Sequence, residues 1–92
     1  MIATLIRRTT SGGQQVSLFR MDPPVMDAFG HHHTYTHVSG IDLGVIAGID
    51  AREVMAWGCT QAGEPEGLEL VRLEGTTDAS EALARLGYEV AE

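Results

Sequence analysis

The feature that most constrains the fold is a pair of β-prone segments separated by two glycines. Residues 2–10 are rich in β-prone side chains, and residues 14–20 alternate between polar and apolar ones, as a half-buried strand does. Ser11-Gly12-Gly13 lies between them and is typical of a tight turn, because glycine adopts positive φ without a clash at Cβ. We therefore predict an N-terminal β-hairpin. Asp22-Pro23-Pro24 is expected to end it, because proline has no N–H for the ladder.

The next part of the chain predicts a loop followed by a strand. Residues 25–32 are the expected loop, and residues 33–41, rich in threonine, tyrosine and valine, are the expected strand. Because side chains alternate along a strand, His33, Tyr35 and His37 are expected to share one face.

The segment that follows is ambiguous. Residues 43–49 are an apolar run that is consistent with a short buried strand. Residues 50–57 then allow two interpretations. Asp50 and Glu53 have the spacing of a helix capping box, whereas a tight turn beginning at Asp50 would lead into a strand from Glu53 to Trp57. The residues alone leave helix and strand both open here.

The clearest helix signal lies at residues 78–87. Asp78 occupies an N-cap position with Glu81 three residues later, which is the spacing of a capping box, and Gly87 is a C-cap residue. The apolar residues at helical spacing between them are Ala79, Ala82, Leu83 and Leu86. Because the helix has only about two turns, packing on a sheet is needed to hold it.

The remaining patterns complete a sheet for this helix to cover. A polar loop at residues 61–67 precedes an alternating segment at residues 68–73, and residues 88–90 predict a short final strand. The 92 residues make one domain, 1–92. We predict a small α+β domain, in which a mostly antiparallel sheet, made of the N-terminal hairpin plus a meander, is covered by one C-terminal helix.

The charge distribution argues against nucleic acid as a partner. The chain has 13 acidic and 6 basic residues, a net charge of −7. Residues 1–24 hold three Arg and one Asp, whereas residues 25–92 hold three Arg and twelve acids. Because affinity for phosphates comes mostly from cations, this balance is the reverse of what DNA or RNA requires. An acidic body serves solubility or favours a partner with basic patches.

The sequence also predicts neither a membrane span nor secretion. No apolar run approaches the ~18 residues that a membrane helix needs. Arg7 and Arg8 interrupt the first segment before the apolar stretch of a signal peptide can form. The single cysteine, Cys59, allows no internal disulfide, which fits a reducing compartment.

Four histidines within seven positions are the most conspicuous chemical feature. Alternate residues of an extended chain are about 6.6 Å apart on one face, so His31 and His33 have the spacing of an H-x-H metal chelate. His37 is about 13 Å from His33, too far for the same ion, so a third ligand would come from Asp27, Cys59 or another strand. The pair invites comparison with cupins, although the second histidine motif of that fold is missing. The competing interpretation is a solvated, histidine-rich loop.

No catalytic constellation and no cofactor-binding motif emerge. No local signature of a nucleophile surrounds Cys59, and a lone cysteine in a small domain is typically a buried thiol. Phe29, Tyr35 and Trp57 are candidate anchors for a protein partner, because aromatic residues dominate interface energetics. Each of the three also fits a core position.

Several segments resemble small proteins, without an assigned activity, of mycobacteriophages and related actinobacterial phages. The segments are MIATLIRRTTSGGQQVSLFRMDPP, HTYTHVSGI, Val54-x-x-Trp57 and Asp78-x-x-x-Ala82-Leu83-x-x-x-Gly87-Tyr88-Glu89-Val90. The resemblance implies that the segment around Val54 is a hairpin arm, which favours the strand at residues 50–57. The triple histidine and residues 58–68 depart from the pattern. The implied context is a phage accessory product in a bacterial cytoplasm or a virion.

These observations give one leading hypothesis and two alternatives. The leading one is a non-enzymatic phage accessory protein that binds a host or phage protein in the cytoplasm of the infected bacterium. The first alternative is a head or tail decoration subunit of the virion, which predicts a homo-oligomer. The second is a small cupin-like metal protein that uses His31 and His33.

Overall fold

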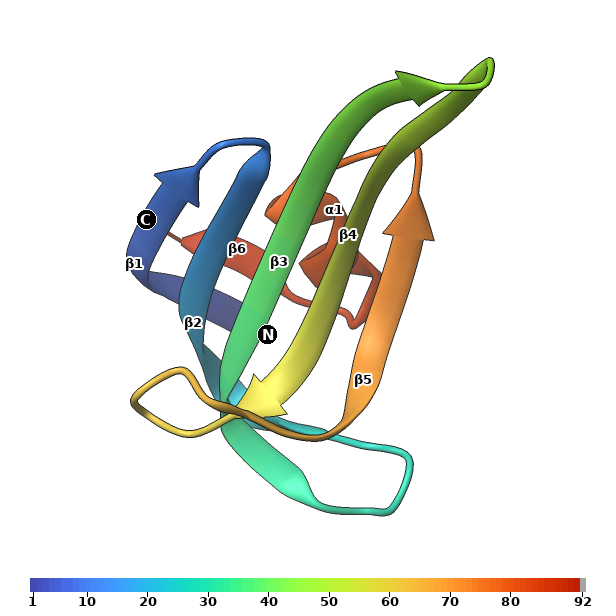
Figure 1. Cartoon of the computed structure of the whole chain (residues 1–92). Coiled ribbons are helices and arrows are strands. Elements are labelled where there is room, and N and C mark those ends of the chain that lie inside the picture. Colours follow the sequence, from blue (N-terminus) through green and yellow to red (C-terminus); the bar gives the residue numbers. More distant parts are fainter. Residues whose placement is uncertain (92) are drawn as a thin grey trace.

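The computed structural model describes residues 1–91, which form six strands and one short helix (Figure 1). In chain order the elements are β1 (Ile2–Ser11), β2 (Gln14–Met26), β3 (His32–Ile46), β4 (Ile49–Cys59), β5 (Pro65–Glu74), α1 (Ala79–Arg85) and β6 (Glu89–Ala91).

The strands form one sheet in the order β5-β4-β3-β2-β1-β6. Strands β1 to β5 are an antiparallel meander in which each strand pairs with its neighbours in sequence. The chain then returns through α1, and β6 pairs in parallel with residues 2–4 of β1. The predicted hairpin, meander and single C-terminal helix are confirmed in outline. The domain is predominantly β, however, because the helix has only 7 residues.

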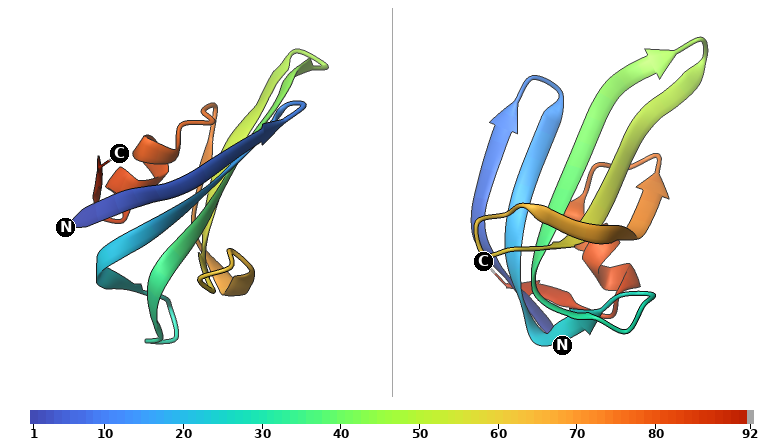
Figure 2. Two further views of the ribbon diagram at one scale, coloured as in Figure 1. Left: turned by 90° about the vertical axis from the view of Figure 1, so that its left-hand side faces the viewer. Right: turned by 60° about the horizontal axis from the view of Figure 1, so that its bottom comes forward.

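Helix α1 covers one face of the curled sheet, which we call the inner face, and the loop between β4 and β5 lies on the other side, the outer face (Figure 2). Side chains from the sheet and from the helix form one buried cluster. Its largest fully buried members include Phe19, Met21, Val38, Val54 and Leu83. Burial of these apolar side chains is what holds so short a helix in place.

The N-terminus of α1 is capped as the sequence predicts, but only in part. Oδ1 of Asp78 accepts a hydrogen bond from the backbone N–H of Ser80 at 2.9 Å. The backbone N–H of Asp78 donates to Oγ1 of Thr76 at 3.1 Å instead of to Glu81. The capping box is therefore replaced by a hydroxyl from the preceding turn, which satisfies the same donor.

The end of the first hairpin differs from the prediction. The turn at Gly12 and Gly13 is confirmed, but β2 does not stop at Asp22-Pro23-Pro24. It continues to Met26 and pairs with β3 again at Val25. The prolines fall in the interval where β2 and β3 make no pairs, so their missing N–H groups interrupt no bond to β3.

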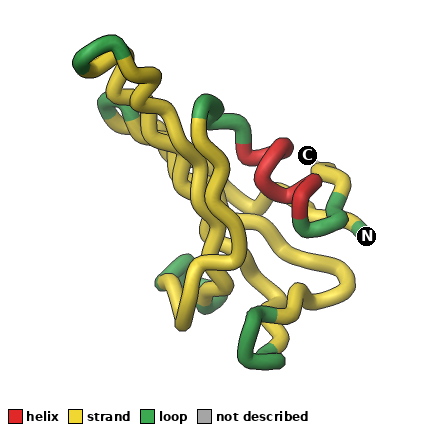
Figure 3. Tube along the Cα trace, turned by 90° about the vertical axis from the view of Figure 1, so that its right-hand side faces the viewer, coloured by secondary structure: helices red, strands yellow, loops and turns green. Residues whose placement is uncertain are grey.

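The hairpin of β3 and β4 extends beyond the rest of the sheet (Figure 3). Pairing with β2 ends at Ile41, and pairing with β5 ends at Glu53, so residues 42–52 form a two-stranded ribbon. Its backbone is bound to neighbouring segments only at its base among the described hydrogen bonds, where Asp42 N–H donates to the carbonyl of Gly13 and the N–H of Gly75 donates to the carbonyl of Arg52. We call residues 42–52 the arm. Its turn consists of Ala47 and Gly48, with φ of 53° and 79°, the positive values that a tight hairpin turn requires.

The arm corrects two predictions and settles a third. Residues 43–49 are not a buried strand, because the neighbouring strands stop short and nothing in the described part of the chain covers them. The turn expected from Asp50 is also wrong, since it occurs three residues earlier. Residues 50–57 are strand, not helix.

Candidate functional site

Asp27 organises the histidine cluster in the loop between β2 and β3. Its Oδ1 accepts the backbone N–H groups of Phe29 and His31 at 2.8 and 3.0 Å. Its Oδ2 lies 2.8 Å from Nε2 of His33. Because a carboxylate only accepts, Nε2 of His33 carries the donated proton. One buried carboxylate thus closes the loop and fixes the orientation of His33.

His33 lies on the opposite face of the sheet from His37, so the prediction of a shared face is wrong for His33. A Cβ atom on Gly58 would be only 2.3 Å from Cγ of His33, which shows that the ring packs directly on this glycine. The ring of His37 instead meets Trp57 edge to face, with 5.8 Å between the centroids. Trp57 and Gly58 are adjacent in β4 and therefore face opposite sides.

The predicted H-x-H pair comes together around Asp27, but the two imidazoles have different surroundings. Nε2 of His33 is engaged by Asp27, while the largely exposed His31 has its Nδ1 3.8 Å from the same Oδ2. Within residues 1–91, no group of three or more His, Cys, Asp or Glu side chains could hold a metal ion. Asp27, considered as a third ligand, acts here as a hydrogen-bond acceptor.

The environment of Asp27 changes its titration. The hydrogen bond from His33 lowers the pKa of the Asp27 carboxyl from its ordinary 3.8 to about 2, against the opposing effect of burial. The folded state therefore prefers the ionised carboxyl more strongly than the unfolded chain does. This contribution to stability is complete above pH 3.8 and is lost as the pH falls from 3.8 to about 2.

We expect Asp27→Asn to remove this part of the acid sensitivity. The variant should be less stable than the wild type at neutral pH, and the difference should shrink towards about pH 2, where the wild-type carboxyl also becomes protonated. Urea midpoints at the two pH values measure it. Asp42→Asn is the control, because Asp42 is exposed and accepts only the N–H of Gly44 among the described hydrogen bonds. Equal acid sensitivity of wild type and Asp27→Asn would contradict the assignment.

Cys59 is a buried thiol with 4% of its surface exposed. Burial raises the pKa of the thiol to about 11, and the charge of Glu66 adds to the effect. The thiol is therefore protonated near neutral pH, which makes it a poor nucleophile.

A hollow of about 350 Å³ lies on the outer face beside the loop between β4 and β5. Nη2 of Arg7 donates to the carbonyl of Ala62 at 2.6 Å, and Nδ1 of His37 lies 3.0 Å from the carbonyl of Gly63. These contacts tie the loop across the sheet. The lining residues are Arg7, Thr9, Ser11, Gln14, Val16, Leu18, His37 and Gly63.

The predicted aromatic anchors differ in how far they are exposed. Tyr35 and Trp57 are half-buried, and only Phe29 among the three is well exposed, at 69%. Phe29 lies in the loop between β2 and β3. Figure 1 shows this loop at the end of the molecule away from the arm.

The arm carries several exposed apolar side chains. Leu43, Val45, Ile46 and Ile49 are each between 55% and 73% exposed. A hollow of about 350 Å³ begins at the base of the arm and is lined by Ile41, Leu43, Ile49, Asp50, Ala51, Arg52, Glu53 and Glu74. The sequence does not predict this surface, because the same apolar run is equally typical of a strand in the core.

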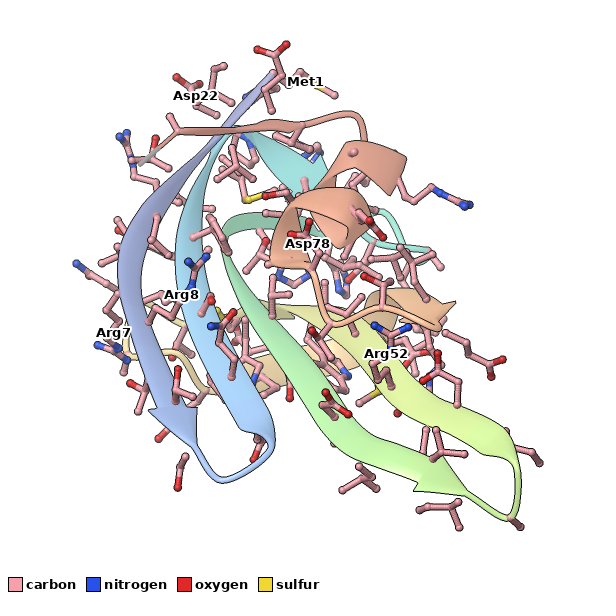
Figure 4. The ribbon with its side chains drawn as sticks, turned by 90° about the horizontal axis from the view of Figure 1, so that it is seen from above. Met1, Arg7, Arg8, Asp22, Arg52 and Asp78 are labelled. Atoms are coloured by element: carbon pink, nitrogen blue, oxygen red, sulfur yellow. The ribbon has the colours of Figure 1, made fainter. Side chains whose placement is uncertain are left out.

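The charges around this hollow are mostly acidic. Arg52, which Figure 4 shows on β4, is paired with Asp50 at 2.8 Å between Nη2 and Oδ2. Glu53 and Glu74 face each other across the β4–β5 ladder at the same place. The arm thus presents apolar side chains beside a rim of negative charge.

The fold and these surfaces define a small, predominantly β domain with a projecting apolar hairpin. Comparison with protein-family models, curated proteins and solved structures finds nothing that matches the chain. Among the described residues, no helix is long and apolar enough to cross a membrane.

Proposed function

We propose that this protein is a non-enzymatic interaction module that docks on another protein through the arm. The single observation that carries the proposal is the exposure of Leu43, Val45, Ile46 and Ile49 on a ribbon that projects from the sheet. Contiguous exposed apolar residues are uncommon on soluble monomers and mark interaction surfaces. A two-stranded ribbon is also marginally stable by itself, so a bound partner would stabilise it.

The partner that fits the arm is a protein with an apolar groove bordered by basic residues. The groove would cover the apolar side chains, and the basic border would meet Asp42 and Glu74, because Glu53 already lies 3.9 Å from Nη1 of Arg72. Arg52 does not oppose this, because Asp50 already compensates its charge. The net charge of −7 also favours encounter with a basic surface.

The chemistry of the remaining groups supports binding more than catalysis. The Cys59 thiol is buried and protonated, and the Nε2 proton of His33 is committed to Asp27. Following the resemblance of the sequence, we place the interaction in a phage-infected bacterium, with a host or phage protein as partner.

Arm variants test the proposal directly. A photo-crosslinking residue at Val45 identifies the protein that contacts the arm in infected cells, and binding to that purified protein is then measured. Leu43→Ser with Ile49→Ser should weaken binding about tenfold or more, because two apolar anchors lose their contact. Met26→Ser with Phe29→Ser is the matched control, since both of these residues are at least 60% exposed at a distance from the arm.

The outcomes separate the alternatives. If the Met26→Ser, Phe29→Ser variant loses binding while the arm variant keeps it, the binding surface lies at the loop between β2 and β3 and the proposal is wrong. If no crosslinked protein depends on the arm, the proposal also fails. Detection of the protein in purified phage particles by mass spectrometry, with the crosslink to a structural protein, would identify the module as a virion subunit.

A further inference from the structure

The hollow beside the loop between β4 and β5 is built from three rows of residues that pair across the strands. Counted from β1, the rows are Arg7 with Leu18 and His37, Thr9 with Val16, and Ser11 with Gln14. Because alternate residues of a strand share a face, all three rows point to the outer side of the sheet. We call this space of about 350 Å³ the outer hollow.

The loop between β4 and β5 closes one end of the outer hollow. Nη2 of Arg7 donates to the carbonyl of Ala62 at 2.6 Å, and Nδ1 of His37 lies 3.0 Å from the carbonyl of Gly63. Because a carbonyl only accepts, Nδ1 of His37 carries the donated proton, which leaves Nε2 of a neutral imidazole as an acceptor. The two side chains and the loop thus hold one another in place as a wall.

The polar groups of the other two rows have hydrogen-bonding capacity left for a ligand. Nε2 of Gln14 donates to Oγ of Ser39 at 3.0 Å, which fixes the amide and leaves its Oε1 as an acceptor. The hydroxyls of Thr9 and Ser11 take part in no hydrogen bond among those of residues 1–91. Two hydroxyls and an amide oxygen therefore form a rim that can both donate and accept.

Between these polar groups the outer hollow has an apolar strip and no negative charge. Leu18 is buried, and Val16, the next residue of β2 on the same face, is half-buried. No acidic residue of the described chain lines the space, although the net charge of the whole chain is −7. A cationic ligand would find no carboxylate here, and the guanidinium of Arg7 is already bound to the loop. A purely apolar ligand would leave the rim without partners.

We propose that the outer hollow binds a small neutral saccharide, a monosaccharide or a disaccharide. The C–H face of a sugar ring would pack on Val16 and Leu18, and its hydroxyls would exchange hydrogen bonds with Thr9, Ser11 and Oε1 of Gln14. Because several of the polar side chains are held in place before a ligand arrives, binding orders few groups. None of the lining residues belongs to the arm, so this binding is separate from the proposed function.

An NMR titration of the ¹⁵N-labelled protein tests the proposal. The probes are the methyl glycosides of glucose, galactose, mannose and N-acetylglucosamine, together with maltose. At least one probe should shift the backbone N–H signals of β1 and β2 along the outer hollow and of Gly63, with a dissociation constant in the millimolar range. The arm variant (Leu43→Ser with Ile49→Ser) should bind this saccharide as the wild type does, because it leaves the outer hollow unchanged.

Two substitutions on β1 form a matched pair. Thr9→Val keeps the shape of the side chain and removes one hydroxyl of the rim, so it should weaken binding about three- to tenfold. Thr10→Val makes the same change at the next residue, which is also exposed but points to the opposite face, and should leave binding unchanged. Val16→Phe fills the space above the strip and should abolish binding. A dispersed NMR spectrum establishes that each variant is folded.

Three results would overturn the proposal. The first is that no probe shifts the signals of the outer hollow at concentrations far above the millimolar range. The second is that Thr10→Val weakens binding as much as Thr9→Val does. The third is that inorganic phosphate shifts these signals while the saccharides do not, which would make the outer hollow an anion site.

Discussion

Replacing Leu83 with alanine is expected to lower the free energy of unfolding by about 2–5 kcal/mol. Leu83 is fully buried where the 7-residue helix meets the sheet, so the change removes apolar contacts and leaves a cavity. A domain of this size has a total stability of about 5–14 kcal/mol. The loss is therefore a large fraction of the whole, and urea unfolding followed by circular dichroism measures it.

The same substitution on the arm is the matched control for Leu83. Leu43→Ala removes the same atoms from a side chain that is 64% exposed, so its effect should stay within about 0.5 kcal/mol. A similar loss for the two variants would mean that the arm is packed against something in the free protein. It would contradict both the exposed arm and the binding role proposed for it.

The second large effect is expected at Gly58. A Cβ atom there would lie 2.3 Å from Cγ, 2.4 Å from Nδ1 and 2.5 Å from Cδ2 of His33. The hydrogen bond to Asp27 holds the ring in place, so the ring cannot move away without losing that bond. We expect Gly58→Ala to lower the free energy of unfolding by about 1–3 kcal/mol, the usual effect of overpacking, and urea unfolding measures it.

A double-mutant cycle isolates this contact. On a His33→Ala background the space that the ring occupied is empty, so the added methyl group of Gly58→Ala should cost much less than in the wild type. The coupling between the two positions is the quantity to measure. If Gly58→Ala costs as much without the ring as with it, the destabilisation comes from the backbone of β4 and not from His33.

The parts of the fold that the sequence predicts well are those with local signals. The glycine pair after Ser11 places the first hairpin, and Asp78 with the apolar spacing behind it places the helix. In both cases the physical cause, a positive φ or an unsatisfied N–H, lies within a few residues. Such local features can be predicted from the sequence without knowing how the rest of the chain folds.

The arm could not be predicted in the same way. An apolar run is buried only if neighbouring strands reach as far as it does, and that depends on where β2 and β5 begin and end. Gln14 pairs with Ile41 and Glu74 with Glu53, so both neighbours stop at the base of the arm. The local signal that was available is the turn at Ala47 and Gly48, with an aspartate on either side of the apolar run.

In the histidine cluster, too, one part could be predicted from the sequence and another part could not. The sequence places Asp27 near His31 and His33 and allows the three residues a common role. It does not show that His33 is turned towards Gly58, away from the face of His37. This occurs where the regular pairing of β2 with β3 is interrupted between Arg20 and Val25, an irregularity that the alternation of side chains does not reveal. The result is a buried hydrogen bond that shapes a loop.

The parallel pairing of β6 with the start of β1 has a consequence for synthesis on the ribosome. Residues 2–4 are translated well before their outer partners, residues 89–91. The backbone N–H of Glu89 donates to the carbonyl of Met1 at 2.9 Å, so this register joins positions that are far apart in the sequence. During synthesis, the outer edge of β1 at residues 2–4 therefore stays unpaired after the meander β1–β5 has been made. The sheet described here is complete only when β6 has left the ribosome.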